Sequence, residues 1–345
     1  MRNLLLFHAV VFTLAISIVQ VHAQIVKNDT GNVKPIGKLY DIGGYYLHLN
    51  CTGKGEPSVI LISGALAFSF DWTLVQDRLQ KYAKICSYDR PGLAWSDPGP
   101  MPRSFEQDVY ELHKLLASAK IKPPYILAGH SVGGIIARKF AKEYPNEVSG
   151  LVLVDATSEN SLMDINGKIE RLRLLASPDK KIPPLKEKVD TLIRIPSAKE
   201  IEEFWSMMGK PSISQPFDKL PVPIQKARIW AQSLPKYYTA DNGDFWSEEF
   251  AQMFSESLAY KIGNKPLIIL CSTKNEYPKE LGQAVTDSLM TDKMQNQKRF
   301  LDISLNSKLM TTANSGHEIH LTEPDLIVDA IKQVISSVKT KQKLK

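Results

Sequence analysis

Residues 124–145, PYILAGHSVGGIIARKFAKEYP, constrain the fold of this chain more than any other segment. They begin with a short uncharged apolar run at 125–128, which is typical of a buried parallel strand. A helical pattern follows from Val132 and ends at Pro145. Between the two lies Gly-His-Ser-Val-Gly, a G-x-S-x-G turn with Ser131 at its centre. A strand, a tight turn and a helix in this order predict a nucleophile elbow that projects Ser131 at the carboxyl end of a sheet.

The motif alone is also compatible with an ordinary glycine-rich turn between a strand and a helix. The chain must therefore supply partners for Ser131 elsewhere. On both sides of the motif, apolar runs alternate with helical patterns. The sequence predicts strands at 59–62, 85–88, 148–154, 266–270 and 308–310, a hairpin over 40–51, and helices at 105–119, 284–295 and 324–338. Strands separated by helices predict a mostly parallel α/β sheet.

The alternation stops between residues 158 and 262. This segment carries helical patterns, prolines and many large apolar side chains, but no apolar strand of the earlier kind. A long helical insertion between two core strands predicts a lid over the carboxyl edge of the sheet, where open α/β sheets bind their ligands. The expected organisation is a core in two parts, 24–157 and 263–338, a helical lid at 158–262, and a basic disordered tail at 339–345.

The first 23 residues have the pattern of a secretory signal peptide. Arg2 supplies a positive start, residues 4–19 are almost wholly apolar, and Ala23 provides a small residue at the cleavage position. The apolar run is short for a membrane span, although an uncleaved anchor remains an alternative. We expect a secreted or periplasmic protein whose mature chain begins near Gln24.

Composition argues against three other classes of protein. The net charge of +6 is spread thinly, and the chain has no basic stripe with interleaved aromatic residues, so a nucleic-acid partner is not expected. Three cysteines, Cys51, Cys86 and Cys271, are too few for a disulfide-framework domain, and no Cys/His spacing matches a zinc site. An exported compartment does permit one disulfide and one buried free thiol.

Four blocks of sequence make the chain resemble the α/β-hydrolase superfamily over residues 40–338. They are Ile-Ser-Gly-Ala at 62–65, Tyr-Asp-Arg-Pro-Gly-Leu at 88–93, the elbow at 129–134, and Ser-Gly-His at 315–317. The resemblance implies an eight-stranded, mostly parallel sheet, with the nucleophile after the fifth strand and a helical lid inserted after the sixth. Because this fold supports many activities, it does not by itself identify the substrate.

The resemblance assigns roles to four residues. Ser131 is the nucleophile, and His317, which lies in a loop after the last short strand, is the base that removes its proton. The oxyanion hole would use the backbone N–H groups of Val132 and Ala65. Where the family usually has His-Gly before the second donor, this chain has Ser-Gly at 63–64. Because the donor is the backbone N–H of Ala65, an oxyanion hole can still form with Ser-Gly at this position.

Two carboxylates are candidates for the acid of the triad. Asp155 follows the strand at 148–154, where a minority of the fold's members carry the acid. The commoner position lies after 266–270, and there the chain has Asn275 followed by Glu276. Both satisfy the order serine, acid, histidine. We favour Asp155, because it directly ends a rigid core strand, and keep Glu276 as the alternative acid.

Other polar residues are expected to have structural roles. Asp71 lies near the first block, Asp89 and Arg90 are interpreted as a local ion pair, and His320 is expected to pack near His317. In the family's strand order the second strand lies beside the fourth. This order implies a possible disulfide between Cys51 and Cys86, with Cys271 free and buried.

These observations predict an exported serine hydrolase that cleaves a carboxylic ester through an acyl-enzyme. The expected partner is a small-molecule ester, and the aromatic and Met-rich lid favours one with an apolar acyl or aromatic group. No metal or organic cofactor is implied. Alternatives are hydrolysis of an amide, a thioester or a C–C bond by the same triad, or a binding protein that kept the fold without turnover. The presence of Ser131, His317 and an acid favours an enzyme.

Overall fold

The computed structural model describes residues 33–165, 168–189, 196–241 and 243–344. The predicted signal peptide, 1–23, lies outside the described residues. Within the described ranges, no helix combines the length and the apolar character that a membrane span needs.

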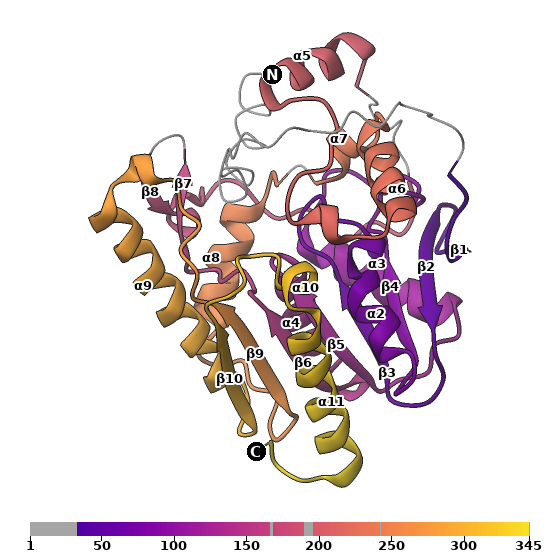
Figure 1. The fold of residues 1–345 in the computed structure, drawn as a ribbon, viewed down its shortest axis with the longest axis vertical. Coiled ribbons are helices and arrows are strands. Elements are labelled where there is room, and N and C mark those ends of the chain that lie inside the picture. Colours follow the sequence, from indigo (N-terminus) through magenta and orange to yellow (C-terminus); the bar gives the residue numbers. More distant parts are fainter. Residues whose placement is uncertain (1–32, 166–167, 190–195, 242, 345) are drawn as a thin grey trace.

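A central eight-stranded sheet organises the molecule (Figure 1). Its strand order is β1-β2-β4-β3-β5-β6-β9-β10. Strand β2 pairs antiparallel with β1 and β4, and the remaining pairs are parallel. The strands are β1 (Lys38–Asp41), β2 (Tyr46–Thr52), β3 (Ser58–Ile62), β4 (Ile85–Tyr88), β5 (Tyr125–His130), β6 (Val148–Val154), β9 (Leu267–Ser272) and β10 (Ser307–Thr312). The predicted α/β-hydrolase sheet is confirmed.

Alternate residues of the buried strands face two separate apolar layers, because side chains of a strand alternate between its faces. In β3, Ile60 packs with α3 (Phe105–Ser118) and α4 (Gly133–Glu143), whereas Leu61 packs with α2 (Thr73–Leu79) and α11 (Pro324–Thr340). Two further helices are α9 (Gln283–Arg299) and α10 (Ile319–Thr322). The 3₁₀ helices are η1 (Ser69–Trp72), η2 (Pro145–Glu147), η3 (Leu172–Leu175), η4 (Phe217–Lys219), η5 (Lys279–Leu281) and η6 (Phe300–Ile303).

In the described part of the insertion between β6 and β9, helices are the main regular elements. It contains α5 (Ala198–Met208), α6 (Val222–Ser233), α7 (Tyr237–Ala240) and α8 (Trp246–Glu256). Figure 1 shows α5, α6 and α7 beyond the carboxyl ends of the strands. The insertion begins with a hairpin that the sequence did not predict, β7 (Leu162–Ile165) and β8 (Lys168–Arg171). Its strand residues are half-buried or exposed, so the apolar run that signals a core strand is missing.

The last helix of the insertion belongs to the main core rather than to a separate layer. Phe250 of α8 is buried in the same cluster as α3, and its ring lies 6.1 Å from that of Phe105. The Glu249 carboxylate accepts a hydrogen bond from the Phe105 backbone N–H at 2.7 Å. The N-terminus of α3 is therefore tied to the insertion by both apolar and polar contacts.

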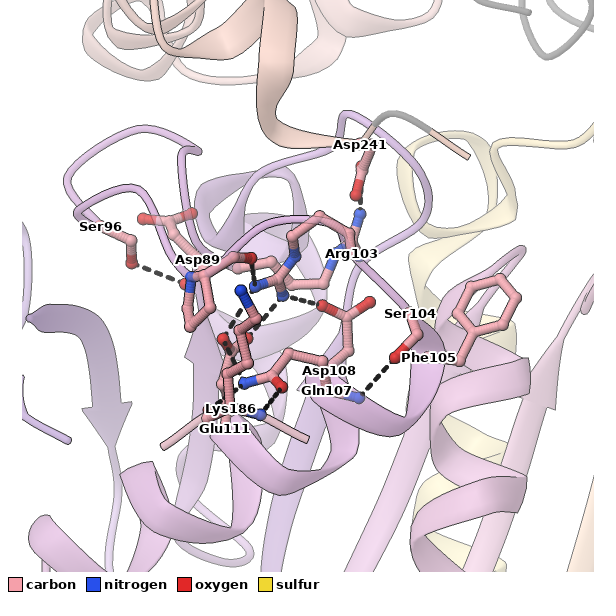
Figure 2. A network of polar contacts seen from close by, with 12 residues as sticks. Asp89, Ser96, Arg103, Ser104, Phe105, Gln107, Asp108, Glu111, Lys186 and Asp241 are labelled. Atoms are coloured by element: carbon pink, nitrogen blue, oxygen red, sulfur yellow. Dashed lines mark hydrogen bonds and ion pairs between the residues drawn. The ribbon is translucent and has the colours of Figure 1, made fainter. Parts of the chain in front are cut away.

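A polar network gathers around the start of α3 (Figure 2). Arg103 donates to both carboxylate oxygens of Glu111, at 2.8 and 2.5 Å, and also contacts Asp108. Gln107 exchanges two hydrogen bonds with the backbone of Lys186, a residue of the insertion, each of 2.9 Å. Because the charges are buried, each needs these partners, and the network fixes residue 186 against the core.

The chain end is more ordered than the sequence suggested. Helix α11 includes residues 339 and 340, and the backbone N–H of Leu344 donates to Asn306 at 2.8 Å. Leu344 also packs against the apolar layer of α11. The lysines at this end predicted a solvated tail. Leu344, the apolar residue that packs against the core, belongs to no helical or strand pattern, so the sequence did not indicate its contact.

Cys51 and Cys86 are paired across the antiparallel strands β2 and β4, and a disulfide joins their sulfur atoms. Cys271 is a free, buried cysteine in β9. Burial raises the pKa of its thiol to about 12. A thiol with so high a pKa is inert as a nucleophile at neutral pH.

Reduction of the disulfide should lower the free energy of unfolding without changing the site. The bond spans 35 residues, and the chain-entropy model assigns such a loop about 4 kcal/mol. Urea denaturation with and without reductant measures this difference. In the double variant Cys51→Ala/Cys86→Ala, reductant should have no effect. Equal midpoints for the wild type in both conditions would contradict the assignment.

Candidate active site

Ser131 lies at the predicted elbow between β5 and α4, in a left-handed backbone conformation with a φ of 52°. This conformation is strained for a serine and needs a tightly packed surrounding. A Cβ at Gly129 would stand 2.3 Å from the Gly133 carbonyl oxygen, and a Cβ at Gly133 would stand 2.2 Å from the Ile62 carbonyl oxygen. Glycine is therefore required at both flanks of the motif.

Asp155 and His317 are brought together at the same edge of the sheet. Asp155 directly follows β6, and its backbone N–H donates to the Leu270 carbonyl at 2.7 Å. His317 follows β10, and its Nδ1 lies 2.7 Å from Asp155 Oδ2. Since an ionised carboxylate can only accept, the Nδ1 atom carries the proton. The Nε2 atom of neutral His317 is left with a free lone pair.

The Asp155 carboxylate is buried and has two further donors. Its Oδ1 atom accepts the backbone N–H of Ser272 at 3.0 Å, and Lys293 Nζ lies 2.9 Å from Oδ2. Burial opposes ionisation, but the charge of Lys293 and the hydrogen bond from His317 outweigh it and hold the Asp155 pKa below its usual range. Asp155 therefore remains a carboxylate throughout the neutral range.

Asp155 also acts on the histidine. Burial disfavours the imidazolium form of His317, but the hydrogen bond and the negative charge of Asp155 outweigh burial and raise the His317 pKa. The charge of Lys293 acts in the opposite direction and moderates this increase. The pair is thus arranged to stabilise a positive charge on His317 when it accepts a proton.

Glu276, the alternative acid, lies beside the same loop but contacts a different part of His317. Its Oε2 atom accepts the backbone N–H of His317 at 2.8 Å. The imidazole ring is bonded to Asp155 instead. The geometry supports Asp155 as the partner of the ring and Glu276 as a support for the loop.

The position of Ser131 Oγ is defined by its neighbours. It lies 3.5 Å from Oγ1 of Thr157. The His317 ring is 4.5 Å from the ring of His130, the residue before Ser131. The loop of His317 therefore packs against the residue that precedes Ser131, and the described residues include no hydrogen bond between Ser131 and His317.

The two predicted oxyanion donors flank Ser131. Val132 follows it directly, and a Cβ added at Gly64 would lie 3.1 Å from Ser131 Cβ, which places the loop with Ala65 beside the serine. Among the described residues, neither the Ala65 nor the Val132 backbone N–H donates to a protein acceptor. Both groups are therefore available to a negative oxygen on a bound ligand.

A histidine and carboxylate cluster supports the loop of His317. His130, Glu318 and His320 bring three potential ligand atoms within 4.8 Å of one another. However, His130 Nε2 lies 3.0 Å from the His317 carbonyl, which only accepts, so this nitrogen carries a proton and cannot bind a metal. Burial lowers the His130 pKa to about 4. Burial also lowers the His320 pKa, so we interpret the cluster as a structural scaffold with two neutral histidines, in which His320 packs on Trp72 with ring centroids 5.0 Å apart.

The expected local ion pair of Asp89 and Arg90 does not form. Asp89 pairs with buried His48 at 2.8 Å, and Arg90 pairs with Asp241 of the insertion at 2.5 Å. Asp89 and Arg90 have different partners, because their side chains point in different directions at the end of β4. Asp71 has the structural role expected of it, pairing with Arg228 of α6 at 2.5 Å.

Sequence reasoning missed Lys293 as a member of the site. It lies on α9, a helix with little segregation of apolar and polar residues, so no pattern distinguishes it from surface lysines. Thr157 and Asp241 were also missed, since neither belongs to a motif.

The fold and site define a hydrolase-type α/β protein with a strained serine, a paired histidine and acid, and two free backbone donors. Comparison with known proteins agrees. The sequence profile described as the alpha/beta hydrolase fold matches residues 57–324, and the chain belongs to that family.

Relatives and solved structures extend the comparison. The chain is 23% identical over 308 residues to an AB hydrolase superfamily protein of Gibberella zeae, covering 84% of this chain and 89% of that protein. Shorter matches cover 19% of a Schizosaccharomyces pombe protein and 46% of a Bacillus subtilis protein, so the chain spans under half of their length.

Two solved structures share the fold at low identity. A thermophilic esterase from Thermogutta terrifontis has a TM-score of 0.58 at 17% identity, covering 88% of this chain and 99% of its own. A meta-cleavage product hydrolase from Pseudomonas fluorescens has a TM-score of 0.57 at 16% identity, with coverages of 86% and 97%.

Replacing each candidate acid by its amide should separate their roles. Asp155→Asn should lower kcat by about 10³- to 10⁴-fold, because the amide can hold His317 in the wrong tautomer. Glu276→Gln keeps an oxygen that can accept the His317 backbone N–H, so kcat should stay within about threefold. Steady-state kinetics, with circular dichroism to confirm folding, measures both. A severe loss in Glu276→Gln with an active Asp155→Asn would reverse the assignment.

The pH dependence of kcat/KM should report the raised pKa of His317. The reaction needs neutral His317, so activity should fall on the acid side with a midpoint above the ordinary histidine value of about 6.5. Lys293→Met removes a charge that lowers this pKa, and should move the midpoint to higher pH. The exposed variant Lys199→Met serves as the control and should leave it unchanged. A midpoint that moves to lower pH in Lys293→Met would contradict the electrostatic account.

Proposed function

We propose that this chain is an exported serine hydrolase that cleaves a carboxylic ester through an acyl-enzyme. The observation that carries the proposal is the 2.7 Å hydrogen bond between Asp155 and His317, formed beside a serine on a strained elbow. An imidazole oriented by a buried carboxylate is the arrangement that activates a serine hydroxyl.

The proposed reaction begins when Ser131 Oγ attacks the ester carbonyl and His317 Nε2 accepts its proton. The N–H groups of Ala65 and Val132 stabilise the negative oxygen of the tetrahedral intermediate. His317 then donates the proton to the leaving alcohol, and the acyl group remains on Ser131. A water molecule, deprotonated by His317, releases the acid by the reverse sequence. Asp155 stays ionised and stabilises the imidazolium in each half-reaction.

Ester hydrolysis is preferred to other reactions for two reasons. A serine, rather than an aspartate, occupies the elbow, which supports acyl transfer over the opening of an epoxide by a carboxylate. The solved structures that share the fold include an esterase, which supports an ester as the proposed substrate.

An apolar acyl or aromatic group is the proposed specificity element. Leu66, next to the proposed oxyanion donor, packs in an apolar cluster with Phe68 and with Tyr237 of α7. Trp230 of α6 lies against Trp95, with ring centroids 5.6 Å apart, at the border of this cluster. Export is supported by the disulfide between Cys51 and Cys86, since such bonds persist in oxidising compartments.

A fluorophosphonate probe tests the nucleophile directly. It should label Ser131, identified by peptide mass spectrometry, and the label should be absent from Ser131→Ala. The same variant should lose about 10⁶-fold in turnover on a panel of esters of increasing acyl length. Ser255→Ala, which changes an exposed serine of α8, is the control and should behave as the wild type. Full esterase activity in Ser131→Ala would refute the proposed function.

A further inference from the structure

The loop that carries the second oxyanion donor rests on the guanidinium of Arg90. This side chain is buried, with 3% of its surface exposed. Its Nη1 atom donates to the Ser63 carbonyl at 2.7 Å, and Nη2 donates to the Gly64 carbonyl at 2.9 Å. The carbonyl oxygens of two consecutive residues therefore point toward the same cation.

The direction of the Gly64 carbonyl determines the direction of the Ala65 N–H. The peptide bond between them is not among the cis bonds of the chain, and in a trans peptide the C=O and N–H vectors are opposed. Holding the Gly64 oxygen against Arg90 turns the Ala65 N–H to the opposite side. Gly64 itself is beside Ser131, so the donor is oriented from behind by the buried arginine.

Asp241, in the segment that follows α7, completes this arrangement from the insertion. Its Oδ2 atom lies 2.5 Å from Arg90 Nη2 and also accepts the backbone N–H of Leu66 at 2.7 Å. Leu66 has a φ of 52°, a left-handed conformation that is strained for a leucine. Figure 2 shows Asp241 reaching the border of the polar network that contains Arg103 and Asp108.

We propose that Asp241 is a positioning residue for the oxyanion hole, which it controls through Arg90 and Leu66. The carboxylate orients the guanidinium that holds the Gly64 carbonyl, and it holds Leu66 in the strained conformation that follows Ala65. Asp241 thus orients the Ala65 N–H through its own contacts with Arg90 and Leu66, and not only by holding the 237–241 segment on the core. This inference rests on the proposed serine-hydrolase function and adds a residue from the insertion to it.

Other contacts keep the insertion in place when Asp241 is changed. Arg228 of α6 pairs with Asp71, and Lys236 donates to the Ser96 carbonyl at 2.7 Å. Lys236 therefore offers a matched control: it anchors the same segment to the core, five residues away, without touching the loop at 63–66. Variants at 236 and 241 can therefore be compared. A loss at both would indicate a role in holding the insertion on the core, whereas a loss at 241 alone would indicate a role in orienting the Ala65 N–H.

The test compares Asp241→Ala, Asp241→Asn and Lys236→Met by two measurements. The first is kcat and KM on the best ester of the panel, and the second is the rate of fluorophosphonate labelling at Ser131. Removal of an oxyanion donor costs about 10²- to 10³-fold in kcat, and a displaced donor should cost about 10- to 10²-fold. We expect this loss in kcat and in labelling rate for Asp241→Ala, with KM within about twofold.

The amide and the control variant complete the comparison. Asp241→Asn still offers an oxygen to the Leu66 N–H but no charge to Arg90, so its loss should be intermediate. Lys236→Met should keep the wild-type kcat and labelling rate. A trifluoromethyl ketone, which forms an oxyanion on Ser131, should bind Asp241→Ala weaker by the same factor as the loss in kcat.

The outcomes distinguish this inference from the proposed function. Wild-type kcat and labelling in Asp241→Ala, or a raised KM with unchanged kcat, would overturn the positioning role while leaving the serine hydrolase intact. An equal loss in Lys236→Met would also overturn it, because the effect would then come from seating alone. Absence of label at Ser131 in the wild type would overturn both proposals.

Discussion

The close approach of α4 to β3 is the constraint on which the site depends. The backbone at Gly133 lies so near the Ile62 carbonyl that no Cβ fits between them. At this contact Ser131 adopts a left-handed conformation, and it lies beside the loop that leaves β3. Ser131 and the loop at 63–66 are thus neighbours because the start of a helix contacts the end of a strand. The parallel sheet makes this possible by ending β3 and β5 at the same edge.

Buried charge provides the second level of organisation. Asp155 lies at the end of β6 with Ser272 N–H, Lys293 and His317 as its partners, so that its negative charge is compensated away from water. The same partners keep Asp155 ionised and raise the basicity of His317. Strain recurs at this edge as well, since Leu66, Ser131 and Asp155 all have positive φ values. Backbone strain of this kind persists only where the surrounding packing over-determines it.

The insertion is joined to the core by more than apolar packing. Its α8 helix contributes Phe250 to the main core and Glu249 to the start of α3, whereas its α6 and α7 segments send Arg228, Lys236 and Asp241 to the loops after β3 and β4. These contacts connect the part of the insertion that lies beyond the carboxyl ends of the strands with the loops beside the candidate site. A conformational change in the insertion would therefore alter the loops after β3 and β4, and the reverse.

The strands, their parallel order and the elbow could be predicted from the sequence, because short apolar runs, glycine spacing and helix-ending prolines act locally. Strands β4 and β6 begin and end where their apolar runs do. The resemblance to the α/β-hydrolase family, carried by motifs at strand ends, pointed to Ser131 and His317, and the position of Asp155 at the end of a core strand favoured it as the acid. The tertiary structure alone decided which atom of His317 each carboxylate contacts, that Arg90 pairs with Asp241 rather than Asp89, and that Lys293 joins the site. Those contacts join residues that are 41 to 162 positions apart in the chain. Their partners depend on where whole elements pack, which no local pattern encodes.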